Sequence, residues 1–171
     1  MKPRYVVMVI LWTMLINGSV SAIDWTDVQL VRGRAAFSDA NGYCVEVDGM
    51  HNTRFEYLGI DPREPLRWIL SSLDREGFPV STCAGKSVPR LRFSFSPTAD
   101  CTIDVNVAVW RQATIDGGIS LLVPVWEADY RGYFRMPDCN DPMPTIRVAV
   151  GEVLRDQVFD LWRRYGVQST Q

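Results

Sequence analysis

An alternation of apolar and polar side chains over residues 90–109 restricts the fold more than any other feature of the sequence. The apolar series comprises Leu91, Phe93, Phe95, Cys101, Ile103, Val105, Val107 and Val109, and the polar positions between them include Arg90, Arg92, Asp104 and Asn106. Side chains along a β-strand point to opposite faces in turn, so this period predicts two half-buried strands. The break at Pro97-Thr98 predicts that they form a hairpin. One face of the sheet should be core, and the polar face should meet solvent or a partner.

Two further regions carry strand signals. The turn Asp116-Gly117-Gly118 leads into a third strand over residues 119–127. Pro124 has no N–H for a strand ladder, so this strand is expected at a sheet edge or bulged there. Residues 34–58 contain Asn41-Gly42 and Asp48-Gly49 between aromatic and β-branched runs. This pattern predicts two or three antiparallel strands.

Two segments have the spacing of amphipathic helices. Residues 62–76 place apolar side chains at i, i+3, i+4 and i+7, with Asp61 and Glu64 in capping positions and Gly77 at the end. Residues 146–165 keep helical spacing up to Gly166, although 146–150 also alternates as a strand would. The expected fold is therefore α+β: an antiparallel sheet with two helices packed on one face, a two-layer sandwich.

The N-terminal 22 residues have the layout of a secretory signal peptide. Lys2 and Arg4 precede an apolar run over residues 5–16, and Val20-Ser21-Ala22 supplies a small-residue cleavage site. A membrane anchor is the alternative, but the run is shorter than the roughly 20 apolar residues of a span. We expect cleavage after Ala22, a single domain over residues 23–171, and a periplasmic or secreted location without a membrane span.

The charge of the chain is mildly acidic. The sequence has 18 Lys and Arg residues against 20 Asp and Glu residues. Loss of Lys2 and Arg4 with the signal peptide would leave 16 basic residues and a net charge near −4. Proteins that bind nucleic acid or anionic membranes usually have a cluster of basic residues. The basic residues of this mildly acidic chain are scattered, so neither kind of partner is expected.

Four cysteines follow the predicted cleavage site. An even number of cysteines in an exported chain indicates two disulfides. Zinc is disfavoured because no pair has C-x-x-C spacing and His51 is the only histidine. The expected strand directions favour pairing Cys101 with Cys139, which leaves Cys44 with Cys83.

No cofactor or catalytic site is expected from the motifs. Gly85-Lys86-Ser87 lacks the earlier glycine of a phosphate-binding loop, because Val80 stands there, and a strand follows instead of a helix. A serine-histidine catalytic site would have to use His51, and the sequence has no G-x-S-x-G motif to present the serine.

Acidic residues form the other candidate cluster. Glu127, Asp129, Asp138 and Asp141 are expected to gather in a loop region near one end of the sheet. Such residues could serve a small exported hydrolase or hold calcium, but capping of the last helix by Asp141 is the simpler explanation.

One segment has more aromatic residues than packing requires. Trp126, Tyr130 and Tyr133 lie close together with Arg131 between them, and these residue types concentrate at protein interfaces. We therefore expect these four residues to contribute to a partner-binding surface. The favoured function is an exported, non-catalytic protein that binds another protein, such as an assembly factor, inhibitor or immunity protein; the alternative is the hydrolase.

Overall fold

The structure is a computed structural model. It describes residues 25–38, 40–48, 61, 63–85, 87–97, 102–116, 118–135 and 141–166, with the backbone alone at 25–27, 97 and 129–135. The chain divides into two compact units, Met1–Leu30 and Val31–Gln171, and the fold below is that of the second. The expected signal peptide lies outside the described residues, and the single domain over 23–171 stays a prediction.

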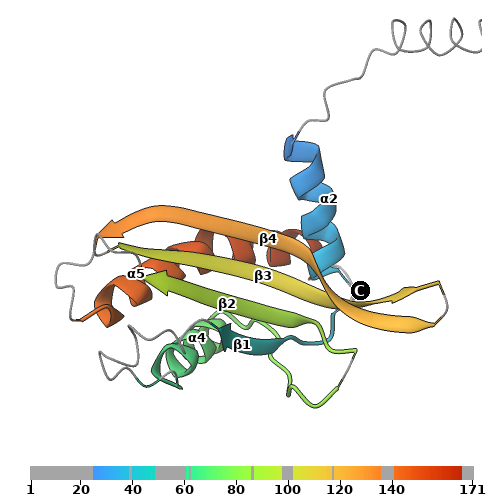
Figure 1. Ribbon diagram of the computed structural model, residues 1–171, viewed down its shortest axis with the longest axis horizontal. Helices are drawn as coiled ribbons and strands as arrows, with labels where there is room; N and C mark the ends of the chain where they lie inside the picture. The colour runs from blue at the N-terminus through green and yellow to red at the C-terminus, as the bar shows by residue number, and fades with distance from the viewer. Residues whose placement is uncertain are drawn as a thin grey trace, which may run out of the picture. The chain divides into compact units, whose positions relative to one another are not determined.

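Within the described residues, four strands form one sheet in the order β1-β2-β3-β4. They are β1 (Cys44–Asp48), β2 (Arg90–Pro97), β3 (Thr102–Ile115) and β4 (Ile119–Arg135) (Figure 1). The pairs β2–β3 and β3–β4 are antiparallel, as the alternation predicts. β4 is an edge strand, and its register with β3 shifts so that Val109 pairs with Trp126 but Trp110 pairs with Pro124. The expectations of an edge position and of a bulge at Pro124 are both confirmed.

β1 corrects the expectation of a purely antiparallel sheet. It runs parallel to β2, with Cys44 opposite Arg90 and Asp48 opposite Ser94, so the sheet is mixed. Parallel neighbours need a crossover connection, usually a helix, and helix α4 lies between these strands in the sequence. The hairpin expected across Asn41-Gly42 is wrong, because Arg34–Phe37 belong to a helix and not to a strand; the chain after the Asp48-Gly49 turn, residues 49–60, lies outside the described residues.

Helix α2 (Trp25–Phe37) was not expected from the sequence. Its apolar residues follow no helical period, and it contains Gly33, a weak helix former. Its last residues, Ala36 and Phe37, are fully buried. Tertiary packing therefore supports this end of the helix more than its intrinsic propensity does.

Helix α4 (Arg63–Arg75) confirms the helix expected over 62–76. At its start, the N–H of Arg63 donates to Asp61 Oδ1 over 2.9 Å. At its end, Gly77 has φ of 70°, and the N–H of Phe78 donates to the carbonyl of Leu73 over 3.0 Å. Glycine at a left-handed position is a common way to end a helix and satisfy its last carbonyls.

The closing helical region is also confirmed, and the alternative of a strand at 146–150 is wrong. It consists of α5 (Met143–Val153), the π-helical η1 (Leu154–Phe159) and α6 (Asp160–Tyr165). Asp141 Oδ1 accepts the N–H of Met143 over 3.2 Å, as expected for a capping residue. The short π-helical segment was not visible in the apolar spacing.

The core lies between one face of the sheet and the helices. Its fully buried side chains include Leu91, Phe93, Phe95, Val107 and Val109 from the strands and Ile69, Leu73, Ile146 and Val150 from α4 and α5. Trp126 is also in this core at 2% exposure, with its ring edge-on to Phe37 at a centroid distance of 5.4 Å. The expectation that Trp126 contributes to a binding surface is therefore wrong, because the β4 register turns it inward opposite Val109.

A buried polar group joins the end of α2 to the sheet. The hydroxyl of Tyr43, a fully buried residue, donates to the carbonyl of Ala36 over 3.0 Å. Arg111 Nη2 donates to the carbonyls of Ala36 and Ser38 over 2.9 and 2.5 Å. Burial raises the pKa of Tyr43 from 10.0 to about 12, although Arg111 acts in the opposite direction.

The free energy of unfolding is expected to fall as the pH rises from 10 towards 12. Below pH 10 the Tyr43 phenol is protonated in both states, so its contribution is complete. Between the two pKa values the unfolded chain loses the proton while the folded chain keeps it. The loss should reach roughly 2–3 kcal/mol. Urea unfolding at several alkaline pH values should show this loss in the wild type and a shallower dependence in Tyr43→Phe; equal slopes would contradict the account.

Candidate functional site

The sheet has a second face, directed away from the core. By register it carries Cys44, Glu46 and Asp48 of β1, Arg90, Arg92 and Ser94 of β2, Asp104, Asn106, Ala108 and Trp110 of β3, and Glu127 of β4. We call this set the open face. Neither α4 nor α5 covers it, because both contribute to the core on the opposite side, and Figure 1 shows both helices behind the sheet. The expectation of a polar second face with Arg90, Arg92, Asp104 and Asn106 is confirmed.

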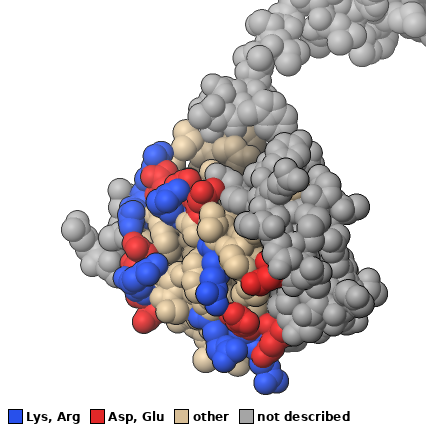
Figure 2. All heavy atoms as spheres, turned by 90° about the vertical axis from the view of Figure 1, so that its left-hand side faces the viewer, with Lys and Arg blue, Asp and Glu red and all other residues tan. Residues whose placement is uncertain are grey.

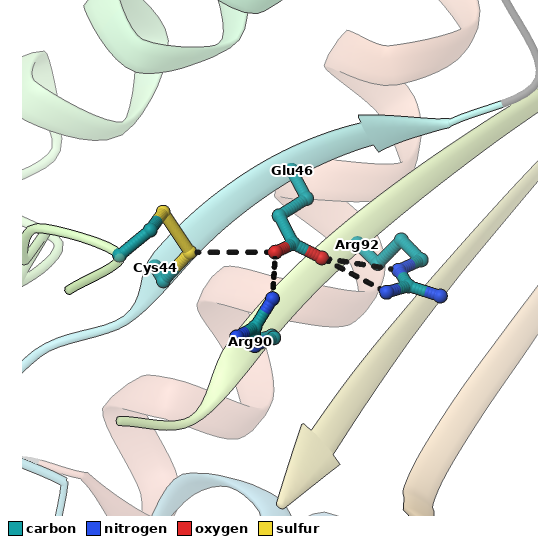
Figure 3. Close-up of a disulfide and its surroundings, with 5 residues drawn as sticks. Cys44, Glu46, Arg90 and Arg92 are labelled. Atoms are coloured by element: carbon teal, nitrogen blue, oxygen red, sulfur yellow. Dashed lines mark hydrogen bonds and ion pairs between the residues drawn. A yellow bond between two sulfur atoms is a disulfide. The ribbon is translucent and has the colours of Figure 1, made fainter. Parts of the chain in front are cut away.

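Glu46 organises the basic side of the open face. Its Oε1 accepts a hydrogen bond from Arg90 Nη1, and its Oε2 accepts two from Arg92, from Nε over 3.2 Å and from Nη2 over 3.0 Å. Figure 3 shows the carboxylate between the two guanidinium groups. The three side chains are 24–29% exposed. One carboxylate thus contacts two cations that remain accessible, and the two hydrogen bonds from Arg92 restrict the direction of its guanidinium group.

Arg92 also lies against an aromatic ring. Its Cζ is 4.9 Å from the centre of the Trp110 ring. A guanidinium over the face of a tryptophan is attracted by the ring, and the contact restrains both side chains. Ala108, between Arg92 and Glu127 in the sheet, offers only a methyl group, and its neighbours cover it almost completely. The result is an Arg-Trp pair in contact on a mainly polar surface.

The β4 side of the open face is acidic. Asn106 Nδ2 donates to Glu127 Oε1 over 2.8 Å, and Asp104 is exposed farther along β3. The open face therefore presents cationic groups over β2 and anionic groups over β3 and β4. Basic and acidic side chains also lie side by side on the described part of the surface in Figure 2.

The disulfide between Cys44 and Cys83 is present, as predicted. It ties the segment that contains Gly85 to the first residue of β1. Cys44 Sγ lies 3.8 Å from Glu46 Oε1, but a disulfide sulfur has no proton to donate, so this is a contact only. Cys101 and Cys139 lie outside the described residues, and their pairing stays a prediction.

A metal site at this disulfide does not fit the residues. Cys44, Glu46 and Cys83 offer ligand atoms within 4.8 Å of one another. However, the two sulfur atoms are bonded to each other, whereas metals bind cysteine as thiolate. Both oxygens of Glu46 are already engaged by arginines, whose positive charge opposes a cation at the same place. The cluster is a structural one.

The other expected site residues are not brought together. Glu127 and Asp129 lie in β4 and Asp141 precedes α5, so the expectation of a shared acidic loop is wrong for these three. Asp138 and His51 lie outside the described residues. Tyr130, Arg131 and Tyr133 belong to β4 by backbone, but their side chains are not described, and their role stays a prediction.

Glu46 and Trp110 are residues of the open face that the sequence analysis does not identify. The apolar series of β3 ends at Val109. Two more positions along the polar series, after Asn106, reach Ala108 and Trp110. A tryptophan on the polar side of an amphipathic strand was the available signal.

No helix of the described residues is long and apolar enough to cross a membrane. Comparison with known proteins shows no matching family model, no similar curated protein and no similar solved structure.

Proposed function

We propose that this chain is an exported, non-catalytic protein that binds another protein through its open face. The Arg92–Trp110 pair is the observation that carries the proposal. Tryptophan and arginine are the residue types most enriched among side chains that dominate binding energy. Here they are held together before any partner arrives.

The prior ordering of these side chains supports a binding role. Binding costs entropy when flexible side chains must be fixed, roughly 0.5–1.5 kcal/mol for each one. Arg92 is already restrained by Glu46 on one side and by Trp110 on the other. The charges of both signs around the pair would select a partner with the complementary arrangement.

Export is the second part of the proposal. The N-terminal pattern of residues 1–22 and the Cys44–Cys83 disulfide support it, since disulfides persist in oxidising compartments. A second disulfide, Cys101–Cys139, would agree with it. The register places Thr102 opposite Arg135, so the chain next to Cys101 and the chain leading towards Cys139 meet at one end of the sheet.

Site-specific photo-crosslinking tests the binding surface in the exported, full chain. A photoreactive residue in place of Ser94, on the open face, is expected to crosslink a partner in the native compartment. The matched control is the same residue at Val148, which is 56% exposed on α5. Trp110→Ala should strongly reduce the yield of the crosslink from Ser94. Crosslinks from Val148 with none from Ser94 would contradict the proposal.

A further inference from the structure

The hairpin of β3 and β4 extends beyond the rest of the sheet. The first residue of β2, Arg90, pairs with Trp110, so among the described strands the later residues of β3 pair only with β4. We call the paired segments 111–115 and 119–123 the ribbon (Figure 1). A two-stranded ribbon is marginally stable by itself in water, because it buries little apolar surface.

The ribbon has an exposed apolar side. Ile115 pairs with Ile119, and Ala113 pairs with Leu121, which places them on one face. Ile115, Ile119 and Leu121 are 48%, 56% and 47% exposed. Neighbouring exposed apolar side chains of this size indicate an interaction site more often than isolated ones do. The opposite side is more polar, with Thr114 next to Ser120.

The free edge of β4 is unprotected along the ribbon. In the described part of the chain, β4 is paired only with β3. Natural edge strands are usually guarded against further pairing by charged residues, by proline or by bulges. Residues 119–126 contain no charged residue. The two features that hinder further pairing, Pro124 and the adjacent bulge, come after residue 123. The segment before Pro124 therefore remains open to another strand.

We propose that a second copy of this chain pairs with this edge, β4 against β4, antiparallel and centred on Leu121. In that register Leu121 faces Leu121 of the copy, and Ile119 faces Val123, so the segment is complementary to itself. A two-fold axis brings identical residues together, so charged residues on the edge would repel their own copies and weaken the dimer. Residues 119–126 contain no charged side chain. The interface uses the edge of β4, so it does not depend on the proposed function of the open face.

Sedimentation velocity of the protein without residues 1–22 tests the proposal over a range of concentrations. The wild type is expected to dimerise. Leu121→Lys would place two ammonium groups opposite each other and should raise the dimer Kd by about tenfold or more. The matched control is Gln112→Lys, which adds the same charge to the ribbon on β3 and should leave the Kd unchanged. Circular dichroism checks that both variants are folded.

Disulfide trapping tests the register. In an antiparallel pair, the Cα atoms of directly opposite residues lie about 4.5–5.5 Å apart, and a disulfide can join residues at this distance. Leu121→Cys should therefore give a covalent dimer on mild oxidation, whereas Ile115→Cys, equally exposed but on β3, should not. A wild type that is monomeric at every concentration overturns the proposal. So does a dimer that Leu121→Lys does not weaken, or one that traps through Ile115→Cys instead.

Discussion

Replacing Cys44 and Cys83 together by alanine is expected to lower the free energy of unfolding by about 4 kcal/mol. The disulfide joins residues separated by 39 positions and so removes much conformational freedom from the unfolded chain. Most domains of this size have only 5–15 kcal/mol in total, so the loss should be evident in urea unfolding. Alanine is the suitable replacement because Cys44 is 1% exposed, and a serine hydroxyl there would be buried.

Reduction of the double variant provides the control. The variant lacks the Cys44–Cys83 bond, so any further loss of stability on reduction must come from the remaining cysteines, Cys101 and Cys139. Such a loss is expected if these two are paired. A loss below about 1 kcal/mol in the double variant itself would mean that the disulfide does not constrain the unfolded chain as the entropy model requires.

Trp126→Ala is expected to destabilise the protein by about 3–5 kcal/mol. The side chain is 2% exposed and packs against Phe37, so its removal leaves a cavity between the sheet and the end of α2. Val148→Ala, an exposed position on α5, is the matched control and should change stability by no more than about 0.5 kcal/mol. If Trp126→Ala cost less than about 1 kcal/mol, the assignment of Trp126 to the core would be wrong.

The elements that could be predicted from the sequence are those with a regular apolar period. The helix over 62–76, the β2–β3 hairpin and the closing helical region all pack one apolar stripe against a common core, so their sequences record which face is buried. Pro124 predicted its edge position because a proline cannot complete a ladder from inside a sheet.

The parallel strand and α2 could not be predicted in this way. The residues of β1 are compatible with either direction, and only the crossover through α4 makes it parallel to β2. α2 has no apolar stripe, and the contacts of Phe37 and the hydrogen bonds from Tyr43 and Arg111 hold its end. These are tertiary contacts between distant positions, which a local pattern does not contain.

The candidate site shows the same division. The polar positions of β2 predicted an open face with Arg90 and Arg92, and the structure confirms it. The concentration of aromatic residues in one short segment, by contrast, pointed to Trp126. Such a concentration does not say which face of a strand a residue occupies. The bulge near Pro124 sets that choice, and it places Trp126 in the core.

The affinity of the crosslinked partner for Trp110→Ala, compared with Val148→Ala, is the most direct test of the proposed function. If the Arg92–Trp110 pair dominates binding, Trp110→Ala should lose about 2 kcal/mol, or roughly 30-fold in Kd, while Val148→Ala binds like the wild type. Titration calorimetry on variants shown to be folded gives both values. Unchanged affinity of a folded Trp110→Ala would contradict the account that the open face is the binding surface.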